Sequence, residues 1–144
     1  MFGNVAGPFA LAATVLTTIT GAAIWAPMTM AQLVENSELI VVGELASIEE
    51  APAAGDPAAG TIQVQEVLRA PAAQQKTTSV RLILPSRTRR MASDAVMYKQ
   101  GQRGIWLLRR DPVTGGYLAD NPQRLKPAAE LADVRAFLKT LPPR

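Results

Sequence analysis

The sequence predicts an all-β fold in the β-dominated α+β class: a five-stranded antiparallel barrel with a C-terminal helix, preceded by one N-terminal transmembrane helix. Three observations predict it. Residues 8–26 carry no charge, five short apolar, β-branched stretches follow between glycines and prolines, and residues 127–141 place apolar side chains at helical spacing. The predicted boundaries are 1–28 for the anchor and 29–144 for the barrel domain with its closing helix.

The first element is the uncharged stretch 8–26, bounded by Pro8 and Pro27. As a helix rising about 1.5 Å per residue it spans roughly 28 Å, close to the roughly 30 Å of bilayer hydrocarbon. Small and hydroxyl-bearing side chains favour close contact with a neighbouring helix, and a tryptophan near the end suits the membrane interface. The predicted membrane-helix contacts are Ala12, Ala13, Thr17, Thr20, Gly21 and Trp25.

A secretory signal peptide is the alternative for this stretch. Signal peptides have a basic n-region and a small-x-small cleavage site. The first basic residue is Arg69, so the n-region is missing, whereas candidate cleavage sites follow Ala23 and Ala31. A buried helix of a soluble domain is a third alternative. With no Lys or Arg near the span, the positive-inside rule does not orient it.

Charge and composition restrict the chemistry. Residues 1–68 carry seven carboxylates and no basic residue, whereas residues 69–144 carry all fifteen basic residues against five acidic ones. The chain has no cysteine and no histidine. Disulfides and thiolate metal sites are therefore excluded, and the commonest general base and transition-metal ligand are missing. We predict no catalytic residue, no cofactor and no metal site.

The barrel domain opens with a capping box at Thr29 and Gln32, which predicts a short helix over 30–36. The β-branched run 39–48 is the first strand, and its glycine marks a bend or bulge. Residues 49–60 hold two prolines and two glycines among alanines, which indicates a flexible surface loop.

Four further strands follow in two pairs. Apolar and polar side chains alternate in residues 61–68, with a phase shift that predicts a bulge near Glu66. In residues 77–84 they alternate without a shift. In this third strand we expect Val80, Leu82 and Leu84 to point inward and Arg81 outward. Residues 104–109 and 116–120 flank a turn and predict an antiparallel hairpin.

A resemblance to known domains is found in four segments of the sequence, which are 37–45, 67–69, 98–108 and 116–118. They are similar to small exported bacterial domains with a first strand S-D-L-I-V-V-G-x-V and a later strand Y-x-x-G-x-R-x-L-x-F-L. The order of elements resembles the oligonucleotide/oligosaccharide-binding (OB) barrel, in the branch of netrin modules and tissue inhibitors of metalloproteinases. The resemblance implies a five-stranded OB-like barrel on the periplasmic side. Those inhibitors chelate zinc through an N-terminal cysteine, which this chain lacks, so metalloprotease inhibition is not carried over.

The candidate binding site is a basic set in the second half of the chain, continued by Arg124 and Lys126. Its members are Arg87, Arg89, Arg90, Lys99, Arg103, Arg109 and Arg110. Such charges can grip phosphates or an anionic protein or lipid surface, or form a solvated face. Single-stranded nucleic acid also needs aromatic stacking platforms, and Trp106 and Phe137 are expected in the core, so nucleic acid is the less favoured partner.

Together these patterns predict a non-enzymatic, membrane-anchored binding module in contact with the lipid bilayer. We expect an accessory subunit of a larger membrane protein assembly, such as an energy-transducing complex. The alternative is an exported soluble OB-like domain that binds an anionic ligand or polymer through its basic second half. The third hypothesis is a hydrolase of unrecognised type. Ser86 or Ser93 with Lys99 could form a Ser/Lys dyad, but loop serines with a solvated lysine are the favoured interpretation of these residues.

Overall fold

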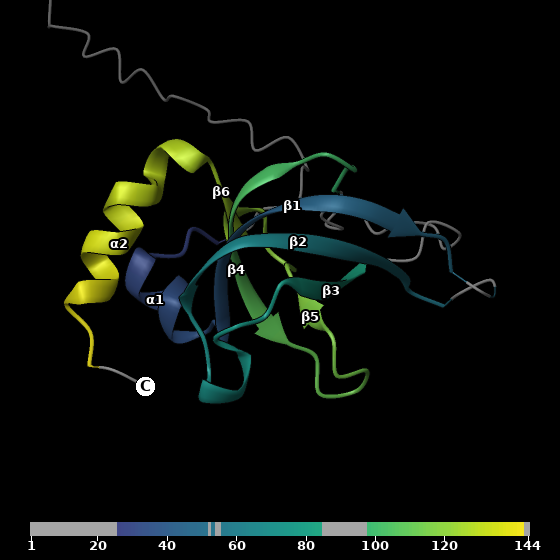
Figure 1. The fold of residues 1–144 in the computed structure, drawn as a ribbon, viewed down its shortest axis with the longest axis horizontal. Helices are drawn as coiled ribbons and strands as arrows, with labels where there is room; N and C mark the ends of the chain where they lie inside the picture. The colour runs from purple at the N-terminus through teal and green to yellow at the C-terminus, as the bar shows by residue number, and fades with distance from the viewer. Residues whose placement is uncertain (1–25, 52, 54–55, 85–97, 143–144) are drawn as a thin grey trace, which may run out of the picture.

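The structure, a computed structural model, describes residues 26–51, 53, 56–84 and 98–142. Five strands close into a barrel and two helices cover one side of it (Figure 1). The elements are α1 (Met30–Glu35), β1 (Leu39–Glu49), β2 (Ala58–Arg69), β3 (Ser79–Leu84), β4 (Arg103–Arg110), β5 (Tyr117–Leu118), β6 (Leu125–Lys126) and α2 (Leu131–Lys139), with short 3₁₀ turns at Ala72–Gln74, Pro122–Arg124 and Ala128–Glu130. The mostly β fold with a C-terminal helix is confirmed.

The barrel is mixed rather than purely antiparallel, which corrects the predicted topology. Each strand pairs with its neighbour in the order β1-β2-β3-β5-β4, and β4 pairs back onto β1. Strand directions cannot alternate all the way round a closed ring of five, so one pair has to be parallel. That pair is β3 with β5, where Leu82 lies opposite Tyr117 and Ile83 opposite Leu118.

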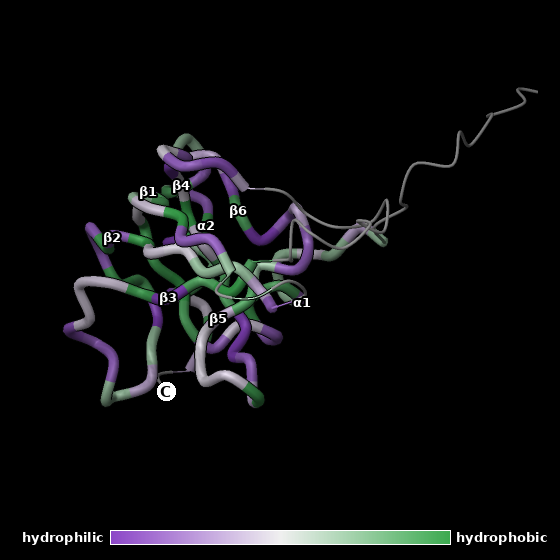
Figure 2. Tube along the Cα trace, turned by 90° about the vertical axis from the view of Figure 1, so that its right-hand side faces the viewer, coloured by the Kyte–Doolittle hydropathy of each residue, from purple (hydrophilic) through white to green (hydrophobic). Residues whose placement is uncertain are grey.

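Strand β1 is buried on both faces, which explains its unbroken apolar run. Leu39 and Val41 point into the barrel, where they pack with Trp106. Ile40 points the other way, into a second cluster with α1 and α2. Figure 2 shows hydrophobic residues concentrated along the strands and hydrophilic ones along several of the connecting loops. Two small cores, one inside the barrel and one beneath the helices, therefore share β1 and β4.

The predicted bulges are present where β1 pairs with β2. The register shifts between Val42 and Gly43, and on β2 the partners jump from Glu66 to Val64. On β3, Val80, Leu82 and Leu84 are buried and Arg81 is exposed, as predicted. Trp106 is fully buried, as predicted for the core, whereas Phe137 is only partly buried.

Two boundaries differ from the prediction. The expected loop 49–60 is shorter, because β2 begins at Ala58 and this alanine pairs with Leu84. The closing helix, expected over 127–141, is a 3₁₀ turn at Ala128–Glu130 followed by α2. The predicted transmembrane helix lies outside the described residues. Among the residues that are described, no helix is long and apolar enough to cross a membrane.

Candidate functional site

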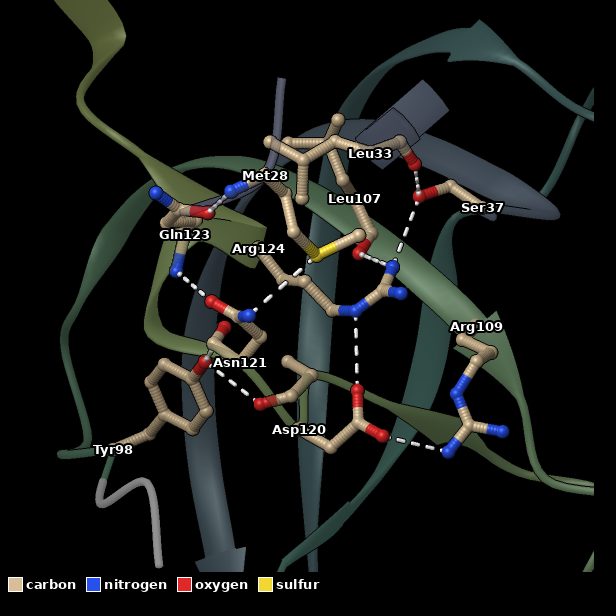
Figure 3. A network of polar contacts seen from close by, with 11 residues as sticks. Met28, Leu33, Ser37, Tyr98, Leu107, Arg109, Asp120, Asn121, Gln123 and Arg124 are labelled. Atoms are coloured by element: carbon tan, nitrogen blue, oxygen red, sulfur yellow. Dashed lines mark hydrogen bonds and ion pairs between the residues drawn. The ribbon is translucent and has the colours of Figure 1, made fainter. Parts of the chain in front are cut away.

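The guanidinium of Arg124 is the centre of a buried polar network beneath α1 (Figure 3). Its Nη1 donates to Ser37 Oγ and to the carbonyl of Leu107, both at 3.1 Å. The Ser37 hydroxyl in turn donates to the carbonyl of Leu33 at the end of α1. One buried cation therefore connects α1, the start of β1 and β4.

Asp120 supplies the counter-charge at the solvent side of this network. Its Oδ1 accepts from Arg124 Nε at 3.1 Å and its Oδ2 from Arg109 Nη2 at 2.6 Å. Partial burial acts to raise the pKa of Asp120, but the hydrogen bond and charge of Arg109, with the charge of Arg124, lower it below its ordinary value. Burial lowers the pKa of Arg124, whereas the negative charge of Asp120 acts to raise it. The carboxylate therefore bridges two arginines as a charged group.

A second branch of the network fastens the beginning of the described chain. The N–H of Met28 donates to Gln123 Oε1 at 2.7 Å, and Asn121 Nδ2 contacts the Met28 sulfur at 3.5 Å. The buried Tyr98 hydroxyl donates to the carbonyl of Ala119 at 2.8 Å. Burial is the main cause that raises the pKa of Tyr98, and the charge of Asp120 adds to it. The phenol therefore stays protonated and acts as a donor. The segment that precedes β6 therefore holds residue 28 against the barrel.

The structure divides the predicted basic set between the two ends of β4. At the start lie the exposed Lys99 and Arg103, and Arg103 pairs with Glu44 at 3.2 Å. At the other end, Arg109 and Arg110 border a surface hollow of about 480 Å³. Arg103 and Arg109 are six residues apart on β4, which at about 3.3 Å per residue separates their backbones by roughly 20 Å. These four cations do not form one continuous patch.

Several predicted site residues lie outside the described part of the chain. They are Arg87, Arg89 and Arg90 of the basic set, and Ala12, Ala13, Thr17, Thr20, Gly21 and Trp25 of the expected membrane helix.

Arg124 requires a correction. The sequence placed it on the continuation of the basic surface, but it is 4% exposed. Local sequence does not signal this, because its partners Ser37 and Leu107 lie far away in the chain and meet only in the folded barrel. Asp120 and Met28, which complete the network, were also missed.

Among the described residues, three of the four aromatic side chains are buried and the fourth is partly buried. Tyr98, Trp106 and Tyr117 are buried, and Phe137 packs against the core beneath α2. The outer face of β2 and β3 carries polar side chains such as Gln63 and Arg81.

Lys99 is exposed, so it lacks the desolvation that would let a lysine activate a serine. The two serines considered beside it lie outside the described part. No group of three or more acidic side chains that could hold a metal ion occurs within the described ranges.

Comparison of the whole chain with protein-family models finds no match, and comparison with curated proteins finds no significant match.

Proposed function

We propose that the chain is a membrane-anchored, non-enzymatic binding module of the OB-barrel type, an accessory subunit packed on a larger membrane protein assembly. The attachment of Met28 carries this proposal. Its backbone N–H and its sulfur both contact the barrel, two residues after the uncharged stretch 8–26 ends. A membrane span at 8–26 enters the domain without a free linker and holds the barrel against the bilayer surface.

Cations close to this attachment point support the same arrangement. Gln123, which accepts from Met28, lies three residues before Lys126, and Lys126 lies opposite Ile105 near the start of β4. Arg103 begins that strand, and Lys99 precedes it. Basic side chains at a membrane surface each gain about 1 kcal/mol from anionic lipid headgroups. We assign Lys99, Arg103 and Lys126 to the membrane-facing end of the domain.

The OB assignment is supported by the strand order. In the ring, β5 is inserted between β3 and β4, so that strands distant in the sequence become neighbours. A closed five-stranded barrel with such a crossed order is what the resemblance to OB domains implies.

The alternative function is that of an exported soluble OB-like domain that binds an anionic ligand or polymer through its basic second half, released by cleavage after Ala23. One observation favours this site over the other candidate. Cleavage after Ala31 cuts α1 and removes Thr29, whose side chain accepts from Gln32 N–H in the capping box. Cleavage after Ala23 leaves both the capping residue and the Met28 contact in place. The structure is therefore compatible with a soluble form that begins at Ile24.

Alkaline carbonate extraction of cells expressing the full chain, followed by intact-mass measurement, distinguishes the two functions. An anchored subunit stays in the membrane pellet with residues 1–23 present. Release into the soluble fraction with Ile24 as the first residue overturns anchoring. Ala23→Leu is the matched variant, because it removes a small residue from the cleavage site. It changes nothing for an anchored chain and moves a cleaved chain into the membrane.

The subunit role is tested separately by purification in a gentle detergent. A stoichiometric complex with a membrane protein supports the proposal. Recovery of the chain alone as a monomer overturns the subunit role and leaves anchoring intact.

A further inference from the structure

No further inference is drawn: the strongest candidate, the apolar seam between α2 and the end of β2 that Phe137, Leu138 and Leu141 line, carries no ligand or partner, because nothing in the structure shows what covers it.

Discussion

Among single residues, Arg124 shows how a charge stabilises this small barrel from within. It is 4% exposed and donates to a hydroxyl, a backbone carbonyl and a carboxylate on three different segments. Burying a guanidinium is costly, and the cost is offset only while all three acceptors remain in place.

We predict that Arg124→Met lowers the free energy of unfolding by about 2–4 kcal/mol, because it leaves the buried Leu107 carbonyl and Ser37 hydroxyl without this donor. Urea unfolding measures the change. Arg110→Met, at an exposed position on the same barrel, should stay within about 0.5 kcal/mol of the wild type. Equal losses in both variants would show that the network does not stabilise the fold.

Asp120 predicts an acid-sensitive contribution to stability. Its folded pKa lies below that of the unfolded chain, so the unfolded chain takes up protons first as the pH falls. The stabilisation is complete well above the ordinary aspartate pKa of about 3.9 and is lost as the pH drops below it. Asp111 contributes in the same direction, because hydrogen bonds from Thr114 and from the N–H of Val113 lower its pKa.

The measurement is urea unfolding between about pH 6 and pH 2.5, across the ordinary carboxyl range. Asp120→Asn should be less stable than the wild type at pH 6 and should lose less stability on acidification. The remaining decline belongs to Asp111 and other carboxylates. Parallel curves for the two proteins would contradict the assigned role of Asp120.

At the level of elements, β1 depends on a glycine at its bulge. A Cβ on Gly43 would lie 2.4 Å from the carbonyl oxygen of Gln63 and 2.9 Å from Ile62 Cγ2. Gly43→Ala should therefore push β1 from β2 and cost about 1–3 kcal/mol, measured by urea unfolding. Ser79→Ala, exposed on β3, is the control and should change stability by less than about 0.5 kcal/mol. An unchanged midpoint for Gly43→Ala would show that the strands adjust without loss.

Elements with a clear residue pattern could be predicted from the sequence. Leu82 and Leu84 alternate with exposed or half-exposed neighbours, and Thr29 with Gln32 forms the expected capping box. The start of β2 could not be found in this way, because Ala58 and Ala59 lie in an alanine-proline stretch that is typical of loops. Pairing with β3, rather than local propensity, makes this stretch a strand.

The candidate site was harder to predict than the fold. Basic residues such as Arg103 and Arg109 were found by charge alone, but only the folded strand shows that they lie at opposite ends of β4. The burial of Arg124 depends on contacts across the barrel, which no local pattern encodes. The partial burial of Phe137, Leu138 and Leu141 depends on how α2 packs, and the sequence of α2 alone does not reveal it.

For the whole molecule, the strand pairs that close the barrel differ in length. Strands β1 and β4 pair along six residues, whereas the parallel closure of β3 with β5 has two residue pairs. We predict that hydrogen exchange is slowest for amides of β1 and β4, such as those of Val41 and Leu107, and fast at Leu118 in β5. Exchange followed by NMR measures this order. Equal protection of Leu118 and Val41 would contradict it.

The pairing of β1 with β4 also determines when the protein can fold during synthesis. Leu39 lies opposite Leu108, so the first strand completes its hydrogen bonds only after the fourth has been made. Closing the intervening chain costs conformational entropy, and the contacts that stabilise the fold form only after this cost has been met. A growing chain can therefore form the β1–β2 hairpin early, but it remains without a closed core until β5 leaves the ribosome. Nearly all of the domain is translated before any of it becomes stable.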